Sequence, residues 1–176
     1  MPINDLQPGI IFVTGGARSG KSRYAQELAL QLSPTPTYIA TARKWDPEFQ
    51  QRIDRHQADR DERWTSIEAE KQISQLPLTG KVAVIDCVTL WLTNFFVDHQ
   101  YDIEACLADC KQEIENLLQQ AGTFIIISNE IGMGVHAETE IGRKFTDLQG
   151  WMNQFIAARA HQVVFMVSGI PMVIKQ

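Results

Sequence analysis

The sequence predicts an α/β fold in which a mostly parallel β-sheet is flanked by helices. Short, continuous runs of apolar and β-branched residues recur along the chain, and amphipathic helical patterns separate them. Runs that are continuous rather than alternating are typical of strands that are buried on both faces. The alternation of such strands with helices indicates βαβ crossovers, which build parallel sheets.

The expected elements follow one another from the first apolar run to the last. Strands are expected over residues 10–13, 38–40, 82–85, 124–127 and 163–167, and helices over residues 22–32, 87–94, 102–120 and about 139–160. The apolar residues of 102–120 fall on one helical stripe, and Gly122 follows the end of this helix. Cys106 and Cys110 lie on that stripe, so we expect them to pack in the core rather than to share a metal ion.

The middle of the chain, residues 42–78, differs in composition from the rest. It contains many charges of alternating sign and no long apolar run. This pattern fits a solvated helix with surface ion pairs, or a helical excursion from the sheet that carries polar site residues. At 176 residues we expect one domain over 1–176, with the charged helical excursion at about 43–78.

The overall composition argues against several classes of protein. Hydrophobic residues make up 44% and charged residues 21%, which is ordinary for a globular protein. The net charge is −5, so the chain lacks the basic surplus of a nucleic-acid-binding protein. No apolar stretch is long enough to span a membrane, and no signal peptide is evident. The three cysteines show no disulfide spacing, so we expect a cytoplasmic protein.

A glycine-rich segment follows the first expected strand and precedes a helix. It matches the pattern G-x-x-x-x-G-K-[ST], in which backbone N–H groups and a helix N-terminus bind phosphate oxygens. The expected nucleotide-binding residues of this P-loop are Gly15, Gly16, Ala17, Arg18, Ser19, Gly20, Lys21 and Ser22. Lys21 is expected to reach the outer phosphates, and Ser22 is expected to offer its hydroxyl to Mg²⁺.

A P-loop also needs a carboxylate that organises the metal ion. Asp86 ends the apolar run over 82–85, so we expect it on a strand beside the P-loop strand, where it binds Mg²⁺ together with Ser22. The alternative is that Asp86 only caps the helix that follows. A P-loop alone does not distinguish a kinase from a GTPase, a motor or a transferase.

Further segments match one family of enzymes in order and along nearly the whole chain. They are residues 13–23, 38–42, Arg52 and Ile53 with His56 and Arg60, Trp64 with Glu68, 86–91 with Asn94, 128–134, Gly150 with 153–154, and 168–171. With these segments the sequence resembles the bifunctional adenosylcobinamide kinase and adenosylcobinamide-phosphate guanylyltransferase family of cobalamin synthesis.

The resemblance implies two reactions on a three-layer P-loop fold of the RecA type. The first phosphorylates the aminopropanol hydroxyl of adenosylcobinamide with a nucleoside triphosphate, ATP or GTP. The second transfers GMP from GTP to adenosylcobinamide phosphate through a GMP-histidine intermediate and gives adenosyl-GDP-cobinamide. The resemblance also implies Mg²⁺ as a cofactor and a homo-oligomer, expected to be a trimer.

The family's nucleophile corresponds to His56 in this chain. A neutral imidazole suits this role because its unperturbed pKa is about 6.5, so it is available to attack the α-phosphorus at pH 7. The other nucleotide contacts that the resemblance implies are Thr41, Ala42, Arg43, Gln57, Ala58, Asp59, Arg60 and Glu68. For Glu68 there is an alternative, because residues 65–68 read T-x-x-E, the form of a helix capping box.

Glu130 is the expected third catalytic residue, besides His56 and Lys21. It lies just after the strand expected over 124–127, where it would orient or deprotonate the attacking hydroxyl. The alternative is that these residues form only a polar turn. Gly132 and Gly134 then suggest a flap, and His136, Ala137 and Thr146 depart from the family's pattern. Two other functions remain open at this point: a P-loop kinase that acts on another small alcohol, and a non-enzymatic nucleotide-dependent switch.

Overall fold

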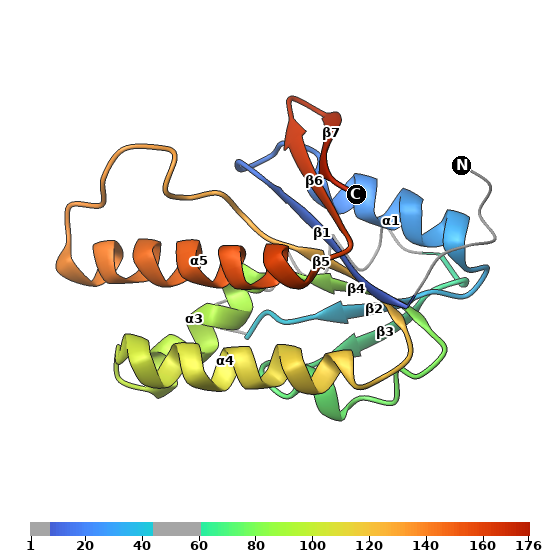
Figure 1. Cartoon of the computed structure of the whole chain (residues 1–176), viewed down its shortest axis with the longest axis horizontal. Helices are drawn as coiled ribbons and strands as arrows, with labels where there is room; N and C mark the ends of the chain where they lie inside the picture. The colour runs from blue at the N-terminus through green and yellow to red at the C-terminus, as the bar shows by residue number, and fades with distance from the viewer. Residues whose placement is uncertain (1–7, 44–60) are drawn as a thin grey trace.

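The computed structural model describes residues 8–43 and 61–176. In these residues one seven-stranded sheet has the strand order β3-β2-β4-β5-β1-β6-β7 (Figure 1). The strands are β1 (Gly9–Gly15), β2 (Thr37–Ala40), β3 (Thr65–Glu68), β4 (Val82–Asp86), β5 (Thr123–Ile127), β6 (Gln162–Val167) and β7 (Ile170–Lys175). All pairings are parallel except that of β6 with β7. The expected α/β class is thereby confirmed.

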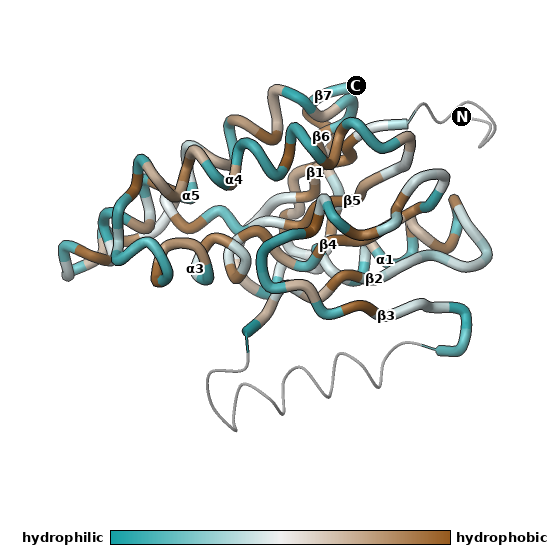
Figure 2. Tube along the Cα trace, turned by 90° about the horizontal axis from the view of Figure 1, so that it is seen from below, coloured by the Kyte–Doolittle hydropathy of each residue, from teal (hydrophilic) through white to brown (hydrophobic). Residues whose placement is uncertain are grey.

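Helices cover both faces of the sheet and give three layers. They are α1 (Lys21–Leu32), α3 (Val88–Asp98), α4 (Ile103–Leu118) and α5 (Glu140–Arg159), with a 3₁₀ turn η2 at Ile73–Gln75. Alternate residues of β1 point to opposite faces of the sheet. Ile10 and Phe12 pack with α3, α4 and α5, whereas Ile11 and Val13 pack with α1 on the other face. In Figure 2 apolar residues gather along the strands between these layers.

The five expected strands and four expected helices are all present, with shifts of a few residues at their ends. Cys106 and Cys110 are fully buried in α4 and pack in the core, as expected. In the part of the chain that the structure describes, no helix is long and apolar enough to cross a membrane.

The helix expected over 43–78 is wrong for the described part of that range. Thr65–Glu68 forms the edge strand β3, which pairs with β2, and Ile73–Gln75 is only a short 3₁₀ turn. The capping-box alternative for Thr65 and Glu68 is wrong for the same reason. Three of the four residues of β3 are exposed, so the strand has no apolar run that would indicate it in the sequence.

Strand β7 was not expected either, and it positions the P-loop. Ser168 and Gly169 both have positive φ, as a two-residue turn between antiparallel strands requires, and this turn connects β6 to β7. The N–H of Gly169 donates to the carbonyl oxygen of Ser19 (3.0 Å). A Cβ atom at Gly20 would lie 3.3 Å from the Cα of Gly169, so the two backbones meet closely. The hairpin therefore supports the P-loop from the side.

The last residue of β1 has no room for a side chain. A Cβ atom at Gly15 would lie 2.5 Å from the carbonyl oxygen of Met166 and 2.8 Å from Ser19 Oγ. We therefore expect Gly15→Ala to lower the free energy of unfolding by about 1–3 kcal/mol, because backbone must shift to admit the methyl group. Urea unfolding measures this change.

Gly134→Ala is the matched control for this prediction. A Cβ atom at Gly134 would meet nothing within 4 Å, so this variant should unfold at the same urea concentration as the unmodified protein. Equal midpoints for both variants would show that the P-loop can move away from β6 without cost.

Candidate active site

The carboxyl ends of the parallel strands gather the candidate residues at one edge of the sheet. The P-loop follows β1, Asp86 ends β4, and Glu130 follows β5. Strand β5 lies between β1 and β4, so the expectation that the Asp86 strand is the direct neighbour of the P-loop strand is wrong. Sequence order does not fix the order of strands in a sheet. Ligands of open α/β sheets bind at this edge, where the strands end.

The P-loop presents its backbone to this edge. Arg18 and Gly20 have positive φ, so the chain turns sharply before α1 begins at Lys21. Gly20 is the N-cap of α1 and, among the described residues, no side chain caps this helix. Its first N–H groups are therefore available to an anion such as a phosphate, which the helix dipole also favours.

Lys21 is the cation of this loop, and it is only 7% exposed. Its ammonium donates to the carbonyl oxygen of Gly16 (2.5 Å) and lies 3.4 Å from Ser19 Oγ. Burial lowers the pKa of Lys21, and the nearby Cys87 and Asp86 act in the opposite direction. A triphosphate in the loop would add negative charge and stabilise the protonated lysine further.

Asp86 joins the P-loop to β4 and β2. Its Oδ2 accepts hydrogen bonds from Ser22 Oγ (2.9 Å) and from the hydroxyl of Tyr38 (2.6 Å). The N-cap of α3 is Cys87, and among the described residues no side chain caps this helix, so the interpretation of Asp86 as a helix cap is wrong. The carboxylate and the Ser22 hydroxyl are adjacent oxygen donors, the kind that Mg²⁺ prefers.

Glu130 is held from two sides. Its Oε1 accepts hydrogen bonds from Thr14 Oγ1 (2.9 Å) and from the side-chain amide of Asn153 (3.1 Å). Its backbone N–H donates to the carbonyl oxygen of Gly15 (3.0 Å). The structure therefore places this carboxylate after β5, as expected, and beside the strand that leads into the P-loop.

A buried polar cluster lies behind Glu130: the sequence noted Ser128 and Asn153 without a role, and it missed Gln149. Ser128 donates to Asn153 Oδ1 (2.6 Å), and the amide of Gln149 donates to Ser128 Oγ (2.9 Å) and to Asn153 Oδ1 (3.0 Å). All three side chains are buried. The available signal was the pair of amides four residues apart on the otherwise apolar stripe of α5, because buried amides need partners.

The expected contacts after β2 are brought to the same edge, and two of them are engaged within the protein. Thr41 is fully buried, and its hydroxyl donates to the carbonyl oxygen of Cys87 (2.8 Å). The Arg43 guanidinium binds Glu70 (2.7 Å) and both carboxylate oxygens of Asp98 (2.9 and 3.0 Å). These hydrogen bonds lower the pKa of Asp98 below its usual range.

The remaining predicted nucleotide contacts are placed only in part. Ala42 is half-buried beside Thr41, and Glu68 is exposed at the end of β3. Ala40 of β2 pairs with Glu68 on one side and with Asp86 on the other. Strand β2 therefore lies between Glu68 and the Asp86 carboxylate. Five further predicted residues lie outside the described residues: His56, Gln57, Ala58, Asp59 and Arg60.

Asn94 was noted in the sequence without a role, and the structure gives it one. It is fully buried in α3, and its amide donates to the carbonyl oxygens of Thr41 (2.8 Å) and Glu70 (2.9 Å). This side chain therefore joins the segments that leave β2 and β3.

The sheet and the P-loop geometry define the class: this is a P-loop nucleotide-binding protein with a three-layer α/β fold of the RecA type. The flagellar accessory protein FlaH from Methanocaldococcus jannaschii has a similar fold, with a TM-score of 0.51 and 13% identity. The superposition covers 98% of this chain and 81% of that chain.

Sequence comparison defines the family. The chain matches the family described as cobinamide kinase / cobinamide phosphate guanyltransferase over residues 11–174, and it belongs to this family. It is 37% identical over 167 residues to the bifunctional adenosylcobalamin biosynthesis protein CobP of Pseudomonas aeruginosa, covering 93% of this chain and 95% of the relative. It is 35% identical over 181 residues to the corresponding protein CobU of Escherichia coli K12, covering 94% and 99%.

The buried ammonium of Lys21 generates the first prediction for this site. Lys21→Ala should raise the Kd for GTP at least about tenfold, because a charge-assisted hydrogen bond contributes about 1.5–3 kcal/mol. Titration calorimetry with GTP and Mg²⁺ measures the change.

Lys144→Ala is the control. This lysine also carries an ion pair, to Glu140 (2.9 Å), but on the exposed surface of α5. The Lys144→Ala protein should bind GTP as the unmodified protein does. Equal GTP affinity for Lys21→Ala would remove Lys21 from the phosphate site.

Proposed function

We propose that this protein is an adenosylcobinamide kinase and adenosylcobinamide-phosphate guanylyltransferase. The observation that supports this most strongly is the family match, which spans residues 11–174 and so includes the P-loop, Asp86 and Glu130 in one continuous alignment. Both relatives compared above are named bifunctional enzymes of adenosylcobalamin biosynthesis. The substrates are adenosylcobinamide, its phosphate, and the nucleotides GTP and ATP.

In the proposed kinase step, each role is given to a residue at the carboxyl edge of the sheet. The P-loop backbone and Lys21 bind the triphosphate and balance its charge. Glu130 accepts a hydrogen bond from the aminopropanol hydroxyl and directs its oxygen at the γ-phosphorus. The oxygen forms the new P–O bond, the bond to the β-phosphate oxygen breaks, and the hydroxyl proton leaves to the carboxylate. Thr14 and Asn153 hold that carboxylate in place.

Mg²⁺ is part of this proposal. Ser22 and Asp86 would hold it, since their oxygens lie 2.9 Å apart at the end of the P-loop. When bound, the ion neutralises charge on the phosphate oxygens.

The guanylyl transfer is assigned to His56. Its neutral imidazole attacks the α-phosphorus of GTP, pyrophosphate leaves, and a GMP phosphoramidate forms. The phosphate of adenosylcobinamide phosphate then displaces the histidine and takes the GMP. Gln57, Ala58, Asp59 and Arg60 are proposed to contact the same nucleotide, together with Thr41, Ala42, Arg43 and Glu68. The support is the family membership, in which one chain performs both reactions.

A trimer in the cytoplasm is proposed as the working form of the protein. Strand β7 supports self-association, because it is an edge strand on which Ile170, Met172 and Ile174 are 65%, 52% and 61% exposed. An apolar edge of this kind favours pairing with another chain. The three free cysteines support a reducing compartment.

The metal assignment predicts a change in the requirement for Mg²⁺. Asp86→Asn keeps a hydrogen-bond acceptor for Ser22 and Tyr38 but removes the negative charge. The Mg²⁺ concentration for half-maximal kinase activity should rise about tenfold or more, because the ion loses a charged ligand. Initial rates over a Mg²⁺ titration measure it.

Asp109→Asn serves as the control for this charge change. Asp109 is exposed on α4, where it contacts His99 (2.8 Å). Its titration should coincide with that of the unmodified protein. A normal Mg²⁺ titration for Asp86→Asn would assign Asp86 a structural role only.

The covalent intermediate predicts an isotope label on the protein. With α-labelled GTP and Mg²⁺, the denatured protein should retain a GMP label that acid releases and alkali spares, and one pyrophosphate should leave for each label. His56→Ala should lose the label and the guanylyl transfer. It should keep phosphorylation of adenosylcobinamide, because phosphoryl transfer to an alcohol needs no covalent histidine.

His99→Ala is the matched control, since this histidine pairs with the surface carboxylate of Asp109 and stacks on Phe95, and neither contact belongs to the proposed nucleotide site. It should take up the label fully. Label on His56→Ala would place the nucleophile elsewhere. A protein that takes up no label and phosphorylates a different alcohol would be a P-loop kinase of another specificity.

A further inference from the structure

A hollow of about 490 Å³ lies between the segment that follows Glu130 and one side of α5. Gly132 and His136 contribute to it from the segment, and Thr146, Gly150, Trp151 and Gln154 contribute from the helix. None of the kinase chemistry derived above uses this hollow. It is nevertheless close to the group that orients the attacking hydroxyl.

Two separate parts of the chain connect the hollow to Glu130. Gly132 is two residues beyond Glu130, so their Cα atoms lie within about 7.6 Å of each other. On the other wall, Asn153 donates to Glu130 Oε1 (3.1 Å), and its neighbour in the helix, Gln154, lines the hollow. One wall of the hollow is therefore connected to Glu130 along the chain, and the other is connected to it through the helix residue Asn153.

The surface of the hollow combines flat, apolar and polar parts. Gly132 and Gly150 provide wall without side chains, and a Cβ atom at Gly150 would meet nothing within 4 Å. The indole of Trp151 is 47% exposed, which leaves a large apolar ring for a ligand to cover. Gln154 adds an amide, and Arg143 and Asp147 add one charge of each sign. Such a surface suits a large ring with an apolar face and a fringe of amide groups.

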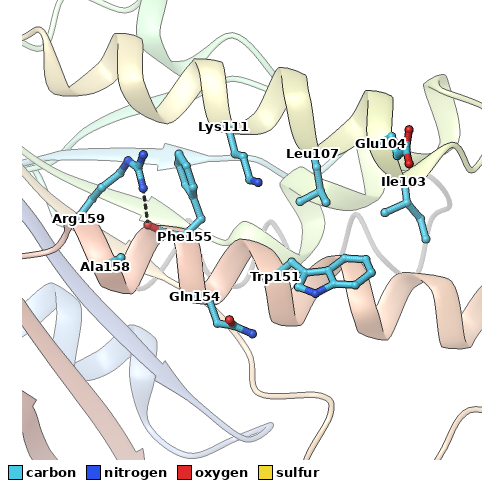
Figure 3. A pocket seen from close by; sticks show the side chains of 9 residues that line it. All are labelled: Ile103, Glu104, Leu107, Lys111, Trp151, Gln154, Phe155, Ala158 and Arg159. Atoms are coloured by element: carbon cyan, nitrogen blue, oxygen red, sulfur yellow. Dashed lines mark hydrogen bonds between the residues drawn. The ribbon is translucent and has the colours of Figure 1, made fainter.

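A second hollow shares part of this wall. It is a groove of about 730 Å³ between α4 and α5, and Trp151 and Gln154 line it too (Figure 3). In Figure 3 the groove continues along α5 to Phe155 and Arg159, where the guanidinium lies 3.4 Å from the ring centroid. That end of α5 leads to β6, which begins at the opposite edge of the sheet. The groove therefore extends away from Glu130.

We propose that the hollow between residues 132–137 and α5 binds the corrin ring of the acceptor. Trp151 packs on the ring, Gln154 hydrogen bonds to its peripheral amides, and the aminopropanol arm extends past Gly132 to Glu130. The inference rests on the proposed function, because only a corrinoid substrate requires a ring site next to the hydroxyl. Beyond the proposed function, the inference names the residues that determine the affinity for the acceptor but not the affinity for the nucleotide.

Filling the hollow tests the proposal without removing any contact that supports the fold. Gly150→Leu adds a side chain into the open space, and leucine is a better helix former than glycine, so the melting temperature should not fall. Equilibrium dialysis with adenosylcobinamide, in the presence of a non-hydrolysable ATP analogue, should show a Kd at least about tenfold higher than that of the unmodified protein. The KM for adenosylcobinamide in the kinase assay should rise in parallel, while GTP affinity stays the same.

Ala158→Leu is the matched control. It places the same side chain on the same helix but lines only the groove between α4 and α5. It should bind adenosylcobinamide as the unmodified protein does. If Gly150→Leu binds normally, or if only Ala158→Leu binds weakly, the ring lies elsewhere and the inference is overturned. If the unmodified protein neither binds nor phosphorylates adenosylcobinamide, the proposed function fails first and this inference fails with it.

Discussion

The buried ammonium of Lys21 is the constraint around which the candidate site is built. A cation that is 7% exposed is costly unless the protein supplies compensating dipoles and charges. Here the P-loop carbonyl of Gly16 accepts from it, and Asp86 lies close enough to oppose the lowering of its pKa. Asp86 in turn is bound by Ser22 and Tyr38, which connects α1, β2 and β4. The carboxylate that opposes the lowering of the Lys21 pKa is thus itself held by two elements, and the lysine lies where it can meet a negatively charged ligand.

Close backbone contact is the second requirement, because a loop that binds phosphate through N–H groups must be held without side chains in the way. Gly15 abuts the carbonyl oxygen of Met166, and Gly20 abuts Gly169 in the turn between β6 and β7. The N–H of Gly169 then bonds to Ser19. The antiparallel hairpin formed by β6 and β7, near the C-terminus, therefore has a clear role. Its turn packs against the P-loop and supports it.

Much of the fold and part of the site could be predicted from the sequence, for reasons that the structure makes plain. The central strands are continuous apolar runs because both faces are buried, so β1, β2, β4, β5 and β6 are all evident. The edge strands β3 and β7 are exposed and were missed, although Ser168-Gly169 between two apolar runs is a hairpin signal. The P-loop and the carboxylates Asp86 and Glu130 have local patterns. The insertion of β5 between β1 and β4 depends on contacts between distant segments that no local pattern encodes. The bonds from Gln149 and Asn153 to Ser128 and Glu130 depend on such contacts too.

Contacts between segments that are far apart in the sequence matter most at Glu130. Phosphoryl transfer to an alcohol depends on positioning and electrostatics, so the orientation of the carboxylate that receives the hydroxyl has to be set before the substrates arrive. Thr14 fixes this carboxylate from the nucleotide side, and Asn153 fixes it from α5. Ser128 and Gln149 both donate to the amide oxygen of Asn153, which leaves its amide nitrogen to donate to Glu130. The Glu130 side chain is thus connected to the strand that leads into the P-loop and to the helix that lines the proposed acceptor hollow. In the proposed kinase reaction, the buried amides of α5 are therefore the physical link between the sites for the two substrates.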